Sequence, residues 1–326
     1  MRSLITRGHL LGVSPFHIAI GLVIAITCCS LTIEARSQRP HRQTPQTGSA
    51  ARFTSATGAL KVTTGHQGSV VFINNVRHGV TNEHGELDLP HVIAGSFPVS
   101  VRTTGYVDWS GSVVILAHAS RTLKVTQQPT ADEATLHFQR GNDLRDKGKN
   151  KDGVEEYRRA LALRSSFPEA RIAIARSLIT LQDFQESETQ IQGALKLGGR
   201  TLLEAQTVLA NLRRAQGLVD ESIVEYKKAL RLARGNSFEA HIGLAIALNE
   251  QEKTDEAVRE YRIGIIQDME TEPILYYQLG EILEKAKRNK EAIEAYRNYL
   301  RLDPEGEYAS AVESIIEQLK QDVDKR

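Results

Sequence analysis

The chain has 326 residues, of which 40% are apolar, 25% are charged and 6% are aromatic, and its formal net charge is +1. This apolar fraction is enough to form packed cores, so a wholly disordered chain is excluded, and the length suggests about two domains. A net charge near zero argues against a general nucleic-acid binder, because such proteins carry a basic excess.

The charge is unevenly distributed along the chain. Residues 1–57 contain six basic residues and one acidic residue. Residues 58–128 are nearly balanced, whereas residues 129–326 contain thirty basic and thirty-five acidic residues. We therefore treat these three segments as separate parts of the chain.

The N-terminal segment has the pattern of a secretion signal. Arg2 and Arg7 form a basic start. Arg7 is followed by 26 residues without charge, and the next charged residue is Glu34. Within this stretch, the strongest apolar run is Ile18–Ile26, and small residues follow it. A basic start, an apolar run and then small residues are typical of a signal peptide. The sequence predicts a signal peptide or membrane anchor over residues 1–35, with cleavage expected after Ala35.

An uncleaved membrane anchor is the alternative. The uncharged stretch exceeds the roughly 20 residues that cross a bilayer, so residues 16–33 could anchor the chain. Both cysteines, Cys28 and Cys29, lie in this stretch. Cleavage after Ala35 would leave a mature chain without disulfides or thiolate metal ligands. Either alternative predicts an exported, periplasmic or cell-envelope protein.

A polar linker and a small β module follow. Residues 36–57 are basic and rich in Pro, Gln and Thr, a composition that cannot bury apolar surface and predicts a disordered linker. Over residues 58–128, apolar residues alternate with polar ones in short runs separated by Gly, Asn and His. This pattern predicts six short strands in a small β-sandwich.

The β module resembles two known families. The segments 68–75 (GSVVFINN) and 94–101 (AGSFPVSV), followed by Gly105-Tyr106, resemble a PEGA domain. The stretch from Gly79 to Tyr106 is equally similar to a carboxypeptidase regulatory-like domain. Either resemblance implies an accessory β-sandwich of secreted or envelope proteins that is not itself catalytic. The pairing of such a module with helical repeats indicates a bacterial origin.

The remaining chain is repetitive. Small residues recur at a spacing of 34 or 35, at Gly141, Ala175, Ala210, Ala245 and Gly280. Sixteen residues after each small residue lies an aromatic or aliphatic residue: Tyr157, Ile191, Tyr226, Tyr261 and Tyr296. This period and pattern resemble the tetratricopeptide repeat (TPR). The resemblance implies five repeats over residues 131–305, forming an all-α solenoid, a right-handed superhelix of helix hairpins. A capping helix is expected over residues 306–326.

Within the repeats, Asp residues stand where the second helix of a hairpin should begin. We expect Asp183, Asp220 and Asp255 to act as N-caps, because an Asp side chain accepts hydrogen bonds from the free N–H groups of a helix start.

The TPR resemblance also implies a binding groove. In this family the first helix of each repeat lines a concave surface. The second, fifth, ninth, twelfth and thirteenth residues of each repeat point inward. These positions predict a groove that is basic at its N-terminal end and acidic at its C-terminal end, suited to an extended peptide. The predicted groove residues are Phe138, Asn142, Arg145, Arg176, Asn211, Arg214, Ile242, Asn249, Glu250, Tyr277, Glu281 and Glu284.

The chain carries no recognisable catalytic motif. The patterns of serine hydrolases, zinc proteases, P-loops and dinucleotide-binding folds are absent from the sequence. Five histidines fall in the β module without a spacing typical of metal ligands. We therefore expect no enzyme activity, no metal site and no cofactor.

Two functions remain open. The first is a non-enzymatic scaffold or adaptor that binds a protein or peptide partner and helps to assemble an envelope complex. The alternative is a structural protein that contacts the cell wall or a glycan through its β module.

Overall fold

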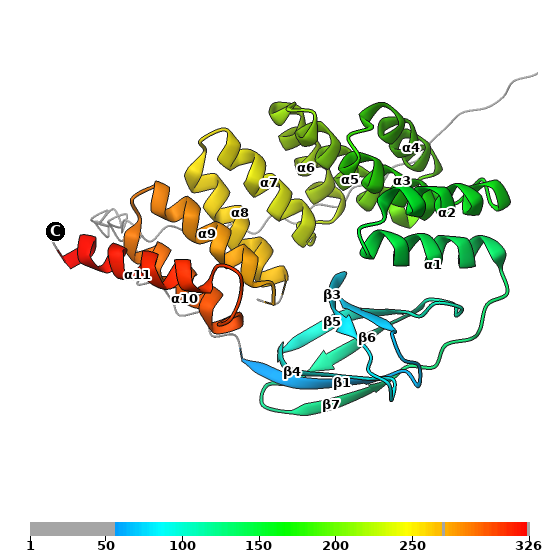
Figure 1. Cartoon of the computed structure of the whole chain (residues 1–326), viewed down its shortest axis with the longest axis horizontal. Coiled ribbons are helices and arrows are strands. Elements are labelled where there is room, and N and C mark those ends of the chain that lie inside the picture. Colours follow the sequence, from blue (N-terminus) through cyan, green and yellow to red (C-terminus); the bar gives the residue numbers. More distant parts are fainter. Residues whose placement is uncertain (1–55, 269–270, 325–326) are drawn as a thin grey trace, which may run out of the picture. The chain divides into compact units, whose positions relative to one another are not determined.

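The computed structural model describes residues 56–268 and 271–324. A β region forms the first part of these residues, and helical hairpins form the rest (Figure 1). This arrangement confirms the predicted fold class, a small all-β module followed by an all-α solenoid. The expected signal peptide or anchor and nearly all of the expected linker lie outside the described residues.

The β region consists of two sheets. One has the strand order β4-β1-β7, with β1 antiparallel to β4 and parallel to β7. The other has the order β3-β2-β5-β6 and is antiparallel throughout. The strands are β1 (Thr57–Thr63), β2 (Val70–Ile73), β3 (Val76–Val80), β4 (Glu86–Ile93), β5 (Gly95–Arg102), β6 (Trp109–Ile115) and β7 (Ser120–Lys124).

The described structure has seven strands in this region, one more than predicted. The additional strand is β3, which forms a hairpin with β2. Asn74 and Asn75 connect these two strands with φ of 53° and 64°. Two-residue hairpins of type I′ require positive φ at both positions, and Asn tolerates this conformation well. The Asn-Asn dipeptide was therefore the sequence signal for the missed strand.

The interior of the β region is built by alternation. In β1, Leu60 and Val62 are buried, while their neighbours Ala59, Lys61 and Thr63 are half-buried. The side chains that meet them between the sheets are β-branched, as expected for a pleated and half-buried surface. The buried core comprises Leu60, Val62, Val71, Ile73, Val92, Val99, Val101, Val113, Ile115 and Val125.

The helical part consists of five hairpins and a final helix. The hairpins are α1 (Glu133–Asp146) with α2 (Asn150–Leu163), α3 (Pro168–Thr180) with α4 (Phe184–Leu197), α5 (Leu202–Ala215) with α6 (Val219–Leu232), α7 (Phe238–Glu250) with α8 (Thr254–Gln267), and α9 (Pro273–Lys285) with α10 (Asn289–Leu302). The short 3₁₀ helix η1 (Gly199–Thr201) precedes α5, and α11 (Ala309–Asp324) follows the last hairpin.

The turn inside each hairpin has the same backbone geometry. One residue per turn adopts positive φ, as expected where a helix ends in a left-handed residue. Glycine supplies this conformation in only two of the five turns. The residues are Gly148, Gln182, Gly217, Glu252 and Lys287.

Only one of the three predicted Asp caps forms. Asp183 precedes α4 and its side chain accepts a hydrogen bond from the Glu186 backbone N–H. The prediction was wrong for Asp220 and Asp255, because α6 and α8 each begin one residue before the Asp. Both carboxylates then lie in the first helical turn, where the helix dipole favours a negative charge.

Tyrosines of the second helices fill the interior of the array. Tyr157, Tyr226 and Tyr296 have no exposed surface. Gly141 faces the Tyr157 ring and Gly280 faces the Tyr296 ring. In both cases a β-carbon on the glycine would come within 2.5 Å of the ring. Glycine is therefore needed there for close approach of the two helices of a hairpin.

Gly280→Ala is expected to lower the free energy of unfolding, although alanine normally stabilises a helix by about 1 kcal/mol over glycine. The new methyl group would overlap the buried Tyr296 ring, and overpacking of this kind costs about 1–3 kcal/mol. Urea unfolding followed by circular dichroism measures the change.

Gly193→Ala in α4 is the matched control for this prediction. The nearest atom to its new β-carbon would be Arg171 Cδ at 3.1 Å, in a flexible side chain that can move. This variant should be as stable as the unmodified chain or more stable. Stabilisation by both alanines would contradict the close-packing argument.

A buried glutamine links α1 to the loop between β5 and β6. The Gln139 side chain is 2% exposed, accepts a hydrogen bond from the Gly105 N–H at 2.9 Å and donates one to the Tyr106 carbonyl at 2.7 Å. Because a buried polar group without partners is costly, these two bonds favour a fixed attachment at this point.

The final helix packs against α10 with one face only. Ala309, Val312, Ile316 and Leu319 are buried, while the opposite face of α11 is polar and exposed. A polar outer face is what the end of a solenoid requires. Among the described residues, none of the helices has the length and apolar content needed to cross a membrane.

Candidate peptide-binding groove

The predicted groove residues lie on the first helices of the hairpins. These helices form one layer, because α1, α3, α5 and α7 pack directly against one another in sequence. Side chains from successive repeats can therefore form one surface. Helix α1 carries Phe138, Asn142 and Arg145; α3 carries Arg176; α5 carries Asn211 and Arg214; α7 carries Ile242, Asn249 and Glu250; and α9 carries Tyr277, Glu281 and Glu284.

Two residues of the first repeat have structural roles. The Phe138 ring packs against Tyr157 and Phe167, with ring centroids 5.7 and 5.0 Å apart. Asn142 is 3% exposed and accepts a hydrogen bond from the Tyr157 hydroxyl at 2.9 Å. Burial leaves little of Asn142 for a ligand, whereas Phe138 is half-buried.

The same tyrosine–asparagine bond recurs in the third repeat. Tyr226 donates its hydroxyl to Asn211 Oδ1 at 2.6 Å. The Asn211 amide in turn donates to Glu239 at 3.2 Å. Burial, and to a lesser degree the neighbouring glutamates, raise the pKa of Tyr226 to about 12 against the opposing effect of Arg214, so this hydroxyl is a donor throughout the physiological range.

Arg176 does not face a free groove. Its guanidinium forms two bonds to the Glu239 carboxylate, at 2.7 and 3.0 Å, and a third to Glu204 at 3.4 Å. These partners come from α7 and α5, so one arginine connects three first helices. Burial raises the pKa of the Glu239 carboxyl, but the charge of Arg176 outweighs it and the net pKa is lowered.

The other two predicted cations also have acidic partners. Arg214 lies 3.3 Å from Glu250, and Arg145 lies 3.3 Å from Asp146. The predicted basic end of the groove is therefore neutralised by the chain itself. The physical reason is that carboxylates of the same layer lie within reach of each of these arginines.

The acidic end differs in this respect. The described residues provide no Lys, Arg or His within 4 Å of the Glu281 or Glu284 carboxylates. Glu284 accepts a hydrogen bond from the Tyr296 hydroxyl at 2.9 Å. The Tyr277 ring stacks on Tyr308, with centroids 4.5 Å apart and an interplanar angle of 21°. Two carboxylates of α9 and a tyrosine stack thus lack a cationic partner among the described residues.

A polar clasp within the repeats was missed by the sequence analysis. In four hairpins the fourth or fifth residue of the first helix bonds a residue nineteen positions later on the second helix. The fifth hairpin has Tyr276 and Ala295 at these positions. The sequence signal for this clasp was a polar pair that recurs at a separation of nineteen residues. The four pairs are His137–Glu156, Arg171–Gln190, Gln206–Glu225 and His241–Glu260.

The clasp at His241 is strongly buried. The ring is 6% exposed, and its two nitrogens lie 2.6 Å from the Glu260 carboxylate and 3.0 Å from the Gly235 carbonyl. Both neighbours are acceptors, which favours a doubly protonated imidazolium. Burial lowers the pKa of His241, but the hydrogen bonds and the charge of Glu260 outweigh it, so the net pKa is raised.

We expect the stabilising contribution of His241 to the array to be lost at alkaline pH. A histidine with a raised folded pKa contributes its full stability below its unfolded pKa of about 6.5 and loses it as pH rises through the folded pKa. His241→Gln removes this titration and recreates the Gln206–Glu225 pairing of the third repeat. The gap in unfolding free energy between the two proteins should shrink by about 1 kcal/mol from pH 6 to pH 9. Parallel curves over this range would contradict the assignment.

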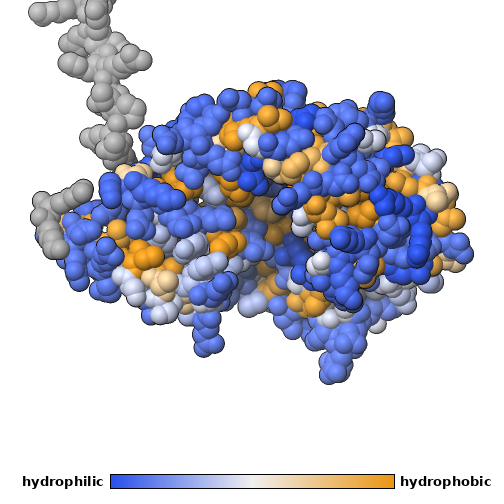
Figure 2. Space-filling model, turned by 45° about the horizontal axis from the view of Figure 1, so that its top comes forward, coloured by the Kyte–Doolittle hydropathy of each residue, from blue (hydrophilic) through white to orange (hydrophobic). Residues whose placement is uncertain are grey.

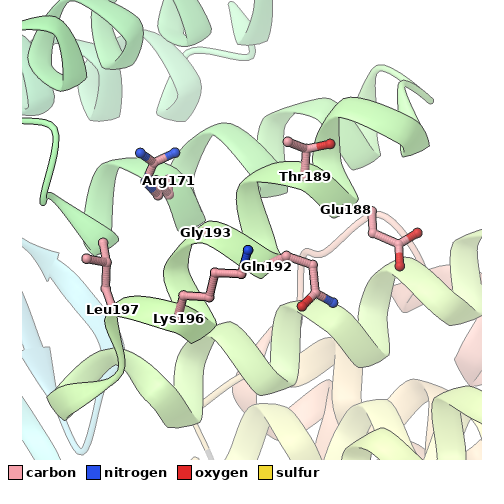
Figure 3. A pocket seen from close by; sticks show the side chains of 7 residues that line it. All are labelled: Arg171, Glu188, Thr189, Gln192, Gly193, Lys196 and Leu197. Carbon is pink, nitrogen blue, oxygen red and sulfur yellow. The ribbon is translucent and has the colours of Figure 1, made fainter.

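One open depression lies beside α3 and α4 (Figure 3). It encloses about 610 Å³ and is lined by Arg171 and by one face of α4 from Glu188 to Leu197. Two of its three charged groups already have partners, since Glu188 pairs with Arg213 and Arg171 bonds Gln190. The side chains in Figure 3 point in different directions and do not converge on one ligand atom.

Other surface features are dispersed. The face seen in Figure 2 is mainly hydrophilic, with apolar residues in separate small groups. Across residues 56–268 and 271–324, no three His, Cys, Asp or Glu side chains gather closely enough to hold a metal ion. The inner layer of first helices is therefore the best candidate site.

Comparison with known proteins identifies the repeats. The tetratricopeptide repeat model matches four overlapping segments, residues 138–200, 172–237, 207–268 and 242–307. Together these segments span more than half of the chain. The chain belongs to the tetratricopeptide repeat family. The resemblance inferred from the repeat period is thereby confirmed, and TPR arrays generally serve protein–protein interaction.

Several solved structures match part of this chain at low identity. The Pseudomonas aeruginosa protein pilF is 14% identical, with a TM-score of 0.50, and the match covers 59% of this chain and 86% of that one. TTC0263, a TPR protein from Thermus thermophilus, is 18% identical, with a TM-score of 0.45 and coverage of 56% and 98%. YrrB, described as a TPR protein with an unusual peptide-binding site, is 17% identical, with a TM-score of 0.40 and coverage of 56% and 93%. No curated protein matches the chain significantly.

Proposed function

We propose that the protein is a non-enzymatic scaffold that binds a peptide segment of a partner protein on the inner layer of its TPR array. The observation that carries the proposal is the direct packing of the first helices α1, α3, α5 and α7, together with the core cluster that α7 shares with α9. Side chains from successive repeats can thus lie on one surface. An extended peptide can contact several repeats at once on such a surface, and polar side chains there can hold its backbone.

The site within this layer is proposed to lie toward its C-terminal repeats. Arg176 and Arg214 are bound to carboxylates of the same chain, so they are poor ligands for an acidic peptide. Asn249, Tyr277 and Glu281 remain half-buried and belong to the fourth and fifth repeats. A half-buried side chain is held in position by its neighbours and still exposes atoms that a ligand can contact.

Affinity capture tests the proposed function. The full chain, immobilised and exposed to a solubilised envelope extract, should retain a specific partner. Glu281→Gln/Glu284→Gln should lose this partner, whereas Glu313→Gln/Asp322→Asn, on the exposed face of α11, should keep it. Equal retention by both variants would place the binding site elsewhere on the protein.

The cellular location is part of the proposal. The N-terminal pattern supports export, with either a cleaved signal or an anchor at residues 16–33. A role in assembling an envelope complex rests on this pattern and on the likeness of the β module to PEGA and carboxypeptidase regulatory-like domains. N-terminal sequencing of the mature protein from cell fractions tests it: a start at Arg36 indicates cleavage, and a retained Met1 in the membrane fraction indicates an anchor.

The wall-binding alternative is supported by one feature of the β module. Strand β6 lies at the edge of its sheet, and Val114 and the following Leu116 are 44% and 61% exposed. Exposed apolar residues at a sheet edge can support a contact. Sedimentation of the full chain with purified cell-wall polymer tests this alternative, and Leu116→Ser should reduce any such binding.

A further inference from the structure

A surface patch on the last repeat combines aromatic rings with carboxylates. Tyr277, Glu281 and Glu284 lie at positions i, i+4 and i+7 of α9 and therefore share one face of the helix. Tyr308, from the segment before α11, stacks on Tyr277. We refer to these four residues as the tyrosine–glutamate face.

The two tyrosines are held in place by their neighbours. The Tyr299 hydroxyl accepts a hydrogen bond from the Tyr308 backbone N–H at 3.1 Å. Tyr299 also contacts Tyr277 edge-on, with centroids 5.9 Å apart. The other four repeats carry a small residue at the position of Tyr299: Ala160, Ala194, Ala229 and Gly264. These contacts hold the two rings in place, and both rings stay partly exposed. Tyr277 and Tyr308 therefore present an ordered aromatic surface to a ligand.

The charge of this face is not compensated by the described residues. Its carboxylates accept bonds from tyrosine hydroxyls, as Glu284 does from Tyr296. By contrast, the inward arginines Arg145, Arg176 and Arg214 all have acidic partners. Burial and the nearby Glu281 charge raise the pKa of Tyr277. The inward arginines are thus paired with carboxylates. The carboxylates of the tyrosine–glutamate face have no Lys, Arg or His partner among the described residues.

Apolar residues extend this face toward the preceding repeat. Ile242 and Ile246 of α7 are partly buried and pack against the same core cluster as Tyr277. A bound chain that crosses from α9 to α7 would meet these side chains after leaving the carboxylates. The surface thus suits a cationic residue followed by an apolar one.

We propose that the tyrosine–glutamate face binds an arginine side chain within an extended segment of a partner protein. A guanidinium can bond carboxylates bidentately and at the same time lie flat on an aromatic ring. A cation over a tyrosine ring gains further electrostatic attraction. This inference rests on the proposed scaffold function and specifies the chemistry of its ligand.

Peptide binding by the full chain tests the inference directly. The chain is kept in a mild non-ionic detergent because of its apolar N-terminal run. The probe is a fluorescent nine-residue peptide of Ser, Thr and Val with two arginines, and fluorescence anisotropy measures its affinity. Its control replaces each arginine by citrulline, which keeps the shape and removes the charge. We expect the arginine peptide to bind about tenfold more tightly than the citrulline peptide, and added salt to reduce this advantage.

Variants of the face locate the binding. Glu281→Gln/Glu284→Gln should weaken binding of the arginine peptide about tenfold, because both carboxylates are lost while Gln can still accept the Tyr296 hydrogen bond. Glu313→Gln/Asp322→Asn removes the same charge from the exposed face of α11 and should leave the affinity unchanged. Thermal melting of both variants verifies that the fold is retained.

Three results would overturn the inference. Equal binding of the arginine and citrulline peptides would exclude recognition of the guanidinium. Equal weakening by the two pairs of substitutions would exclude this face. Binding that appears only after Arg36, Arg39, Arg42 and Arg52 are changed to Gln would assign the face to the chain's own N-terminal segment. If the chain captures a partner from the extract but shows no preference for arginine, this inference fails while the scaffold function stands.

Discussion

Arg176→Glu is expected to destabilise the helical array strongly. The substitution would place a third carboxylate beside Glu204 and Glu239, where the guanidinium now joins three helices. Removing one partner from a fully buried ion pair costs several kcal/mol, and reversal adds repulsion. Because the Arg176 side chain is 27% exposed and Glu239 is 37% exposed, we expect a moderated loss of about 2–4 kcal/mol in unfolding free energy.

Urea unfolding monitored by circular dichroism measures this loss. Arg158→Glu is the matched control, since Arg158 pairs with Glu155 and Glu186 but is 45% exposed. An exposed pair contributes about 1 kcal/mol or less, so the control should lose little. Combining Arg176→Glu with Glu239→Arg should recover part of the stability. Similar losses in both single variants would contradict the special role of the Arg176 cluster.

This prediction changes how a basic groove would be tested. Reversing Arg145, Arg176 and Arg214 together would weaken peptide binding only by weakening the array, because each arginine is bound to a carboxylate of the chain. Substitutions at Glu281 and Glu284 avoid this difficulty. Neither carboxylate has a basic partner among the described residues, and Glu284→Gln keeps an acceptor for the Tyr296 hydroxyl. The paired Gln substitutions therefore test recognition with little effect on folding.

The repeat architecture was predictable from the sequence because its signals are local and periodic. Small residues at Gly141 and Gly280 recur with the repeat period, and their contact with a tyrosine sixteen positions later is visible in the structure. Strand β3 was missed because its Val-Arg-His-Gly-Val sequence has weak alternation, and its position follows from the Asn74-Asn75 turn. Turn chemistry, more than hydrophobic pattern, specifies that strand.

The charge of the groove was not predictable in the same way. Arg176 and Glu239 are 63 positions apart and meet only because successive first helices pack closely. Sequence position indicates that both side chains face inward, but it does not show that they reach each other. The clasp between His241 and Glu260 was within reach of sequence analysis, because a polar pair with a separation of nineteen recurs in four repeats. The family pattern directed attention to the apolar positions instead.

Val312→Asp is expected to have the largest effect of the substitutions considered. Val312 of α11 has no exposed surface and packs in the core shared with α9 and α10. An unpaired carboxylate in such a core is costly, and we expect a loss of about 3–5 kcal/mol in unfolding free energy. The alternative for the chain is release of α11, which would expose the apolar side of the last hairpin.

Release of α11 has consequences that a simple loss of stability does not. Solenoids need a polar end to remain soluble, so the variant should associate in size-exclusion chromatography and be cleaved by protease near residues 304–308. Tyr308 would lose its place on Tyr277, and binding of the arginine peptide should fall as well. Ala311→Asp adds the same group one position earlier, on the exposed face and in the first turn of the helix, where a negative charge is favourable. A protein with Ala311→Asp should behave like the unmodified chain, and equal effects of the two substitutions would show that α11 does not cap the array.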